Sequence, residues 1–208
     1  VVLAGDFYPL WGVPELTDRL YGLTFTLSPQ AFYQVNPVQA ERLYERAVEY
    51  AVNAPTDQVL DLYCGAGTFT LPLARRCDFV AAVEAYGPAV RDLRRNLEIN
   101  KLDNVDVIGG DAVREFPDQD ADILVVDPPR AGLAPEAIDL IASTSARDVA
   151  YVSCDPATLA RDVARFAPLG YHPVRACAVD LFPGTANVET VVLLSKLNTK
   201  QHIEVELN

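Results

Sequence analysis

The sequence predicts an α/β fold with a doubly wound, mostly parallel sheet that finishes in an antiparallel hairpin. The first observation is that strand-like apolar runs alternate with segments of helical period between residues 37 and 166. In one sheet, that order implies right-handed crossovers with helices on both faces. The second is that the strand-like runs 172–181 and 188–197 are joined only by the short segment 182–187. A connection of that length makes a hairpin and cannot hold a crossover.

Residues 1–36 precede the alternation, and we interpret them as the end of a preceding domain or as a lead-in to the next one. Within them, residues 23–27 alternate apolar and polar side chains like a strand. We expect the aromatic side chains of this region to pack within it; they are Tyr8, Trp11, Tyr21, Phe32 and Tyr33.

The alternating region opens with a helix, for which Asn36 suits the N-cap and Pro37 the first turn. Apolar residues then keep helical spacing up to residue 51. The further strands are expected at 58–62, 79–84, 105–108, 122–126 and 149–153, and the further helices at 68–76, 88–100, 135–142 and 156–166. We assign residues 37–197 to one domain. Residues 198–208 are expected to be a tail, or a strand that uses Ile203, Val205 and Leu207.

The composition is that of an ordinary globular protein. Half of the 208 residues are hydrophobic, with no apolar run long enough to span a membrane and no signal-peptide pattern. The four cysteines (Cys64, Cys77, Cys154 and Cys177) lack Cys-x-x-Cys spacing, so we expect no metal site and a reduced, cytoplasmic protein. The formal charge of −12 argues against a chain that grips a phosphate backbone by itself. Because the chain begins at Val1 and contains no methionine, we expect it to be a fragment.

A cysteine stands where a predicted strand gives way to a helix, in Tyr151-Val-Ser-Cys-Asp-Pro156. Functional groups collect at the carboxyl ends of strands in open α/β sheets. Asp155 can cap the helix and Pro156 suits its first position, so Cys154 should lie beside free backbone N–H groups. These groups and the helix dipole would favour the nucleophilic thiolate. The alternative is a small buried hydrophobic residue.

The segment Val59-Leu-Asp-Leu-Tyr-Cys-Gly-Ala-Gly67 leaves a strand and turns on two glycines. Glycines such as Gly65 let the backbone approach a ligand closely, and the N-terminus of the following helix can host polar groups. A dinucleotide fingerprint would need a third glycine where Thr70 stands. Glu84 ends the next strand, 19 residues after Gly65, where a ribose-binding carboxylate belongs. The alternative is a tight turn with a solvated glutamate.

Asp127-Pro-Pro-Arg-Ala-Gly132 follows another predicted strand. Consecutive prolines stiffen the exit from that strand and would hold Asp127 at the carboxyl edge of the sheet. In enzymes that methylate an exocyclic amine, the comparable loop carries an aromatic residue after the prolines. Arg130 stands there in this sequence, which disfavours that reaction.

Five segments together resemble the RNA 5-methyluridine (uracil-C5) methyltransferase family, in the order in which that family has them. They are Phe32-Tyr-Gln-Val-Asn-Pro37, Asp61-Leu-Tyr-Cys-Gly-Ala-Gly-Thr-Phe-Thr70, Asp127-Pro-Pro-Arg-Ala-Gly132, Tyr151-Val-Ser-Cys-Asp-Pro-Ala-Thr158 and Asp180-Leu-Phe-Pro-Gly-Thr-Ala-Asn-Val-Glu189. The resemblance implies a Rossmann-like class I methyltransferase fold, with S-adenosyl-L-methionine as cofactor and transfer or ribosomal RNA as substrate. It implies that Gln34, Tyr63, Glu84 and Asp127 contact the cofactor, that Cys154 is the nucleophile and that Glu189 accepts a proton.

The resemblance also implies an RNA-binding module ahead of the catalytic domain, which would anchor the substrate; we expect no membrane partner and a monomer. Three positions depart from the family pattern. Asp155 replaces an asparagine, and its carboxylate should either disfavour the Cys154 thiolate or be used in capping. Gly184 and Asn187 replace a Gln or His and a His, which bears on the hydrogen bonds that support Glu189.

The chemistry of the family explains why such residues are needed. Thiolate addition at uracil C6 makes C5 nucleophilic enough to take a methyl group, and a base must then remove the C5 proton. The predicted hairpin should bring Glu189 to face Cys154, and the base must leave its stack to reach them. Two alternatives remain: an RNA cytosine-C5 methyltransferase, which usually has a second cysteine in the loop corresponding to Asp127-Pro-Pro-Arg, and a catalytically silent module that binds cofactor or RNA.

Overall fold

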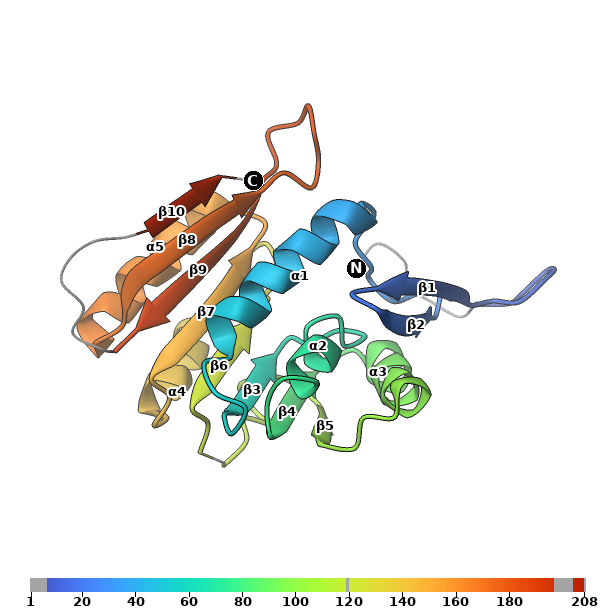
Figure 1. Ribbon diagram of the computed structural model, residues 1–208, viewed down its shortest axis with the longest axis horizontal. Coiled ribbons are helices and arrows are strands. Elements are labelled where there is room, and N and C mark those ends of the chain that lie inside the picture. The colour runs from blue at the N-terminus through green and yellow to red at the C-terminus, as the bar shows by residue number, and fades with distance from the viewer. Residues whose placement is uncertain (1–6, 119, 197–203, 208) are drawn as a thin grey trace.

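The computed structural model describes residues 7–118, 120–196 and 204–207, and its centre is one mixed sheet (Figure 1). The strands of this sheet lie in the order β10-β8-β9-β7-β6-β3-β4-β5. β9 is antiparallel to β7 and β8, and every other neighbouring pair is parallel. The predicted doubly wound sheet with a C-terminal hairpin is therefore confirmed.

The sheet strands are β3 (Gln58–Leu62), β4 (Phe79–Glu84), β5 (Val105–Gly109), β6 (Ile123–Val126), β7 (Asp148–Ser153), β8 (His172–Val179), β9 (Glu189–Ser195) and β10 (Glu204–Leu207). The helices are α1 (Pro37–Ala51), α2 (Thr70–Ala74), α3 (Gly87–Asn100), α4 (Pro135–Ser143) and α5 (Pro156–Phe166), followed by a 3₁₀ turn (Ala167–Leu169). No helix in the described ranges combines the length and apolar composition that a membrane span requires.

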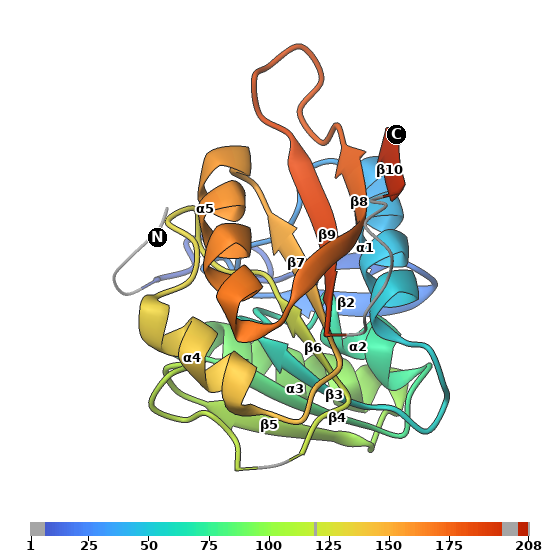
Figure 2. The same cartoon turned by 90° about the vertical axis from the view of Figure 1, so that its left-hand side faces the viewer.

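Two hydrophobic cores lie on the two faces of the sheet. Figure 2 shows α1 on one face and α4 and α5 on the other. Successive residues of a strand pack in opposite cores. On β3, Val59 packs in the core that contains α1, and Leu60 packs in the core that contains α4 and α5. A strand buried on both faces reads as a continuous apolar run. For this reason the central strands were predicted within one residue.

The start of α1 is tied to the far hairpin. The side-chain oxygen of Asn36 accepts a hydrogen bond from the Gln39 N–H at 3.3 Å, as an N-cap does. The amide nitrogen of Asn36 donates to the Leu181 carbonyl at 3.2 Å. One side chain thus caps the helix and holds its end beside the loop between β8 and β9.

A separate hairpin precedes the sheet and consists of β1 (Leu16–Leu20) and β2 (Leu23–Leu27). Its two-residue turn has positive φ at Tyr21 (56°) and Gly22 (67°), as the tight turns of hairpins require. The hairpin is bonded to α3, where Asn96 and Asn100 accept the N–H groups of Thr26 and Thr24 at 2.7 and 3.0 Å.

The strand expected at 23–27 is confirmed, and β1 was not predicted because its centre, Thr17-Asp18-Arg19, is polar. The expectation that the aromatic residues pack within this region is wrong for Tyr8, Trp11 and Phe32. Their exposed fractions are 78%, 95% and 72%.

Two other expectations needed correction. The helix predicted at 68–76 is only α2, since Pro72 lacks the N–H that would bond to the Thr68 carbonyl and the preceding residues form turns. β8 ends at Val179 instead of residue 181, and β9 spans Glu189–Ser195 instead of residues 188–197, so the loop between them covers residues 180–188. Residues 204–207 form β10 beside β8, which confirms the strand alternative there; residues 197–203 and 208 lie outside the described residues.

Candidate functional site

A cavity of about 550 Å³ opens at the carboxyl ends of the parallel strands, a size typical of ligand sites. Its walls come from the segments that follow β3, β4, β5, β6 and β7, from the first residue of β9, and from the segment ahead of α1. All residues that the sequence assigned to a site line this cavity: Gln34, Tyr63, Gly65, Glu84, Asp127, Cys154 and Glu189. Residues far apart in the sequence are therefore brought to one place, as expected of this sheet edge.

The loop after β3 is shaped by residues with positive φ. Tyr63 has φ 65°, although it is not a glycine, and Gly65 and Gly67 have φ 57° and 93°. The Tyr63 and Cys64 N–H groups both donate to the Val83 carbonyl, at 3.0 and 3.2 Å. This fixes the loop against the end of β4. A left-handed tyrosine costs energy, and such strained residues cluster at functional sites.

Glu84 turns its carboxylate into that loop. Oε2 accepts the Gly65 N–H at 2.9 Å and Oε1 accepts the Tyr86 N–H at 2.7 Å. Each oxygen keeps a further lone pair for a ligand hydroxyl. Beneath the loop, the fully buried Asp61 accepts the Thr70 hydroxyl at 2.6 Å, and burial raises its pKa to about 7.

Cys154 and Glu189 face each other across β7 and β9. Ser153, the last residue of β7, pairs with Thr190 of β9. Because the two strands are antiparallel, Cys154, directly after β7, lies opposite Glu189, the first residue of β9. Both side chains line the cavity; Glu189 is only 5% exposed and Cys154 is partly exposed. The predicted juxtaposition is confirmed.

The expectation that the surroundings of Cys154 favour its thiolate is wrong for this structure. Burial raises the pKa of the thiol, the Glu189 and Asp127 carboxylates raise it further, and the Arg130 guanidinium lowers it. Sequence reasoning counted the helix N-terminus but not the two carboxylates that the fold brings alongside. These surroundings therefore favour the thiol form of Cys154 over the thiolate.

Asp155 acts as the cap of α5. Its Oδ1 accepts the N–H groups of Ala157 and Thr158 at 3.0 and 2.9 Å, and the Thr158 bond lowers the pKa of Asp155. Asp155, which replaces an asparagine of the family pattern, was expected either to disfavour the Cys154 thiolate or to cap the helix, and the structure shows the capping role. The carboxylate that most raises the pKa of Cys154 is that of Glu189.

The carboxyl groups near the sulfur are protonated more readily than usual. Burial and the charges of Glu189 and Asp61 raise the pKa of Asp127 to about 8. Burial also raises the pKa of Glu189, and Arg130 lowers it. A carboxyl of raised pKa is a stronger base, which suits a group that must accept a proton.

The other two departures from the family pattern also have local roles. Asn187 Oδ1 accepts a hydrogen bond from Arg130 Nη2 at 2.7 Å, which joins the loop after β6 to the hairpin loop. Gly184 has φ 81° and so permits a turn in the hairpin loop that other residues would resist.

Several lining residues were not assigned to the site from sequence. Asp111 follows β5 directly after Gly109-Gly110, and a carboxylate after two glycines at a strand end was the signal that could have found it. Tyr44 gave no such signal, since it has helical spacing and packs edge-on against Phe69 at 4.6 Å between ring centroids. Phe32 is exposed at the cavity although it was expected to pack.

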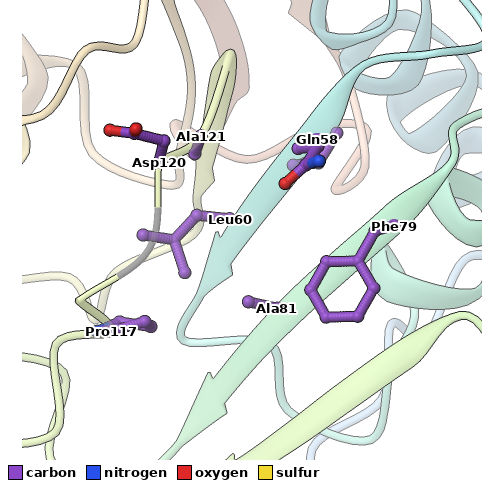
Figure 3. Close-up of a pocket in the computed structure, with 8 residues that line it drawn as sticks. Gln58, Leu60, Phe79, Ala81, Pro117, Asp120 and Ala121 are labelled. Atoms are coloured by element: carbon purple, nitrogen blue, oxygen red, sulfur yellow. The ribbon is translucent and has the colours of Figure 1, made fainter.

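A much smaller hollow of about 10 Å³ lies by the amino ends of β3 and β4 (Figure 3). Gln58, Leu60, Phe79 and Ala81 line it from the two strands, and the remaining wall comes from the loop ahead of β6. It has room for no more than about one water molecule. None of the residues that the sequence assigned to a site lies there.

Three comparisons describe what this chain resembles. The family model for tRNA (uracil-5-)-methyltransferases matches residues 15–197. A protein of Lactobacillus johnsonii called an uncharacterized RNA methyltransferase is 38% identical over 201 residues, which cover 94% of this chain and 45% of that protein. One of Clostridium tetani with the same description is 38% identical over 206 residues, covering 97% of this chain and 45% of its own length.

Among solved structures, the Pyrococcus abyssi tRNA (uracil-54, C5)-methyltransferase in complex with S-adenosyl-L-homocysteine superposes with a TM-score of 0.78. It is 35% identical, and the match covers 88% of this chain and 45% of that one. The chain thus spans about 45% of the length of these relatives.

Proposed function

The chain belongs to the tRNA (uracil-5-)-methyltransferase family, and we propose that it is the catalytic part of an enzyme that methylates uracil C5 in RNA. One observation carries the proposal. Cys154 and Glu189 line the same cavity as Glu84 and the loop that contains Gly65. A nucleophile and a base stand at one end, and a nucleoside-binding carboxylate stands at the other.

The cavity suits S-adenosylmethionine, which carries ammonium and sulfonium charges. The acidic side chains that line it are those of Glu84, Asp111, Asp127 and Glu189, against the one basic side chain of Arg130 among the described residues. Glu84 would bind the ribose hydroxyls, and the Tyr63 to Gly67 loop would lie against the adenosine. Gln34 and Asp127 would hold the amino acid end. When bound, this cofactor supplies the methyl group.

Cys154 would act as the nucleophile. Having lost its proton to water, the sulfur adds to C6 of the uracil, and the C5–C6 electron pair moves onto C4–O4 as an enolate. The enolate electron pair then forms the bond from C5 to the methyl group, and the bond that held this group to the cofactor's sulfur breaks. The covalent step divides one difficult reaction into easier ones.

Glu189 would act as the base that completes the reaction. Its carboxylate removes the proton from C5, the electron pair of the C5–H bond re-forms the C5–C6 double bond, and the C6–Sγ bond breaks to release the thiolate. Burial of Glu189 raises its pKa, and this increases its affinity for that proton.

The test uses RNA in which the target uracil is 5-fluorouracil, incubated with the full-length protein and S-adenosylmethionine. Fluorine cannot leave C5 as a proton, so the enzyme should remain attached to methylated RNA. The adduct is detected by gel mobility and mass spectrometry. Cys154→Ala should abolish it. Cys77→Ala is the matched control, because Cys77 is a buried cysteine outside the lining of the cavity, and it should retain the adduct.

Glu189→Gln should trap a methylated adduct on ordinary RNA, since only the proton step is lost. Adduct formation undiminished in Cys154→Ala would contradict the proposal. An adduct with 5-fluorocytosine RNA alone would favour the cytosine-C5 alternative. A lack of reaction with any verified substrate would favour a silent binding module.

A further inference from the structure

We propose that Arg130, bonded to Asn187 beside the cavity, is the cation that stabilises the ionised sulfur of Cys154, and that Asn187 is the residue that positions it. This inference rests on the proposed function, because it assigns the source of the charge that the nucleophile needs. It concerns two side chains to which the family resemblance gave no role.

Both the side chain and the backbone of Arg130 make hydrogen bonds to other segments. Its guanidinium Nη2 donates to Asn187 Oδ1 at 2.7 Å, 57 residues away in the chain. The Thr158 hydroxyl, in the first turn of α5, lies 3.2 Å from the Arg130 carbonyl and 3.0 Å from that of Asp155, and shares its proton between them. Thr158 stands four residues after Cys154, and Asn187 stands two residues before Glu189. The contacts therefore hold Arg130 between the elements that carry the nucleophile and the base.

The loop that carries Arg130 is itself held rigidly. Two prolines precede Arg130, and the next carbonyl, that of Ala131, accepts Arg161 Nη2 at 2.7 Å. Gly132 has φ 78°, and a Cβ there would lie 2.4 Å from a carboxylate oxygen of Asp162 and 2.5 Å from Arg161 Nη2. Only a glycine therefore fits at position 132, where the loop packs closely against side chains of α5. A charge on such a loop is preorganised, since its position is set before substrate arrives.

The charges around the sulfur show why a cation is needed there. The charged and titratable groups that face this end of the cavity are Tyr44 from α1, Asp127 and Arg130 from the loop after β6, and Glu189 from β9. Asp155, on the same element as Cys154, is used in capping α5. Glu189 and Asp127 raise the pKa of the Cys154 thiol, and Arg130 is the side chain that lowers it.

Arg130 also acts on the base. It lowers the pKa of Glu189, which burial raises. A cation beside both groups keeps a thiolate and a carboxylate compatible within one partly buried site, where like charges otherwise disfavour one another. Replacing it by a neutral side chain should therefore leave the sulfur protonated at a pH where the native enzyme has ionised it.

The test measures the alkylation rate of Cys154 by iodoacetamide from pH 6 to 10, on the full-length protein without RNA or cofactor. The Cys154 peptide is quantified by mass spectrometry, apart from those of the other cysteines. The midpoint of the pH profile for Arg130→Met should move upward by about 0.5–1 unit, below the usual range of about 1–3 units for a lost opposite charge, because Arg130 is exposed and solvent screens its charge. Arg130→Lys should restore most of the native midpoint.

Asn187→Ala keeps both charges and removes only the bond that positions Arg130, so it should shift the midpoint in the same direction by a smaller amount. Arg91→Met, on exposed α3, is the matched control for loss of one positive charge and should leave the midpoint unchanged. Because Arg130 and Asn187 are exposed, these variants are expected to fold, and circular dichroism checks this.

An unchanged midpoint in Arg130→Met would overturn the inference. So would a variant that binds RNA more weakly, with a salt slope lower by about 1, at an unchanged midpoint, since that is the signature of a phosphate contact. The alkylation assay involves no uracil chemistry. A shifted midpoint together with no 5-fluorouracil adduct in the native enzyme would therefore count against the proposed function and leave the role of Arg130 standing.

Discussion

At the scale of single residues, the loop after β3 contains two glycines that are needed for different reasons, backbone conformation and lack of space. Gly65 and Gly67 both have positive φ, which costs other residues about 1–2 kcal/mol. Only Gly67 is also enclosed: a Cβ there would lie 2.5 Å from Leu93 Cδ1 and 2.6 Å from Leu71 Cδ1. Nothing lies within 4 Å of a Cβ at Gly65.

Gly67→Ala should therefore cost more than Gly65→Ala. We expect about 1–2 kcal/mol for Gly65→Ala from backbone strain alone, and roughly 1–3 kcal/mol more for Gly67→Ala from overpacking against the two leucines. Urea unfolding monitored by circular dichroism measures both. Equal losses in the two variants would show that the leucines move aside without cost.

Asp127 gives stability a pH dependence. Its pKa is raised to about 8 in the folded protein, from an ordinary value of 3.8. Between these two values the folded state holds a proton that the unfolded state has lost, so this group makes stability fall as pH rises from about 4 to 8. Asp127→Asn should flatten the profile and make the variant more stable than the native protein at pH 8.

The measurement is the free energy of unfolding at pH 5 and pH 8. Asp139→Asn, on the exposed side of α4, removes the same formal charge from a solvated site and is the control. A profile for Asp127→Asn that runs parallel to that of the native protein would contradict the raised pKa.

At the scale of elements, one buried carboxylate connects α5, β7 and the loop that carries Asp127. Asp162 is fully buried, and its Oδ2 accepts the Leu133 N–H and the Tyr151 hydroxyl, both at 2.8 Å. Its Oδ1 accepts Arg161 Nε at 2.9 Å. The helix α5 and the loop after β6 are thus held in one arrangement.

Asp162→Ala should destabilise the fold by about 3–5 kcal/mol, because it leaves buried donors without an acceptor. Tyr151→Phe removes one of these bonds and should cost about 1 kcal/mol. Urea unfolding of both variants measures which of them loses more free energy of unfolding. A cost for Asp162→Ala no greater than that for Tyr151→Phe would mean that water replaces the carboxylate.

At the scale of the whole molecule, the net charge of −12 limits what the chain can bind by itself. Phosphate backbones are held by clustered basic side chains, and the cavity contributes one arginine among the described residues. We expect this chain alone to bind unstructured RNA with a dissociation constant above about 1 μM at physiological salt. Fluorescence anisotropy with labelled RNA measures it, and submicromolar binding would show that the chain carries its own anchor.

The sequence by itself determined the strands of the central sheet and a set of residues that the fold brings to one cavity. Strands buried on both faces are continuous apolar runs, and Gly, Pro and Asn mark where elements begin and end, so local patterns were enough. The ordered motifs contain Gln34, Tyr63, Gly65, Asp127, Cys154 and Glu189, and Glu84 was found from its place at the end of a strand 19 residues after Gly65; all of them line one cavity.

Only the tertiary structure decided the electrostatics of that cavity and the contacts that hold it. The pairing of β7 with β9 and the loop after β6 bring Glu189 and Asp127 close enough to raise the pKa of Cys154, which the helix N-terminus alone was expected to lower. The Arg130 to Asn187 bond spans 57 residues, and no local pattern encodes it. Charge interactions depend on distance and burial in space, and spacing along the chain specifies neither.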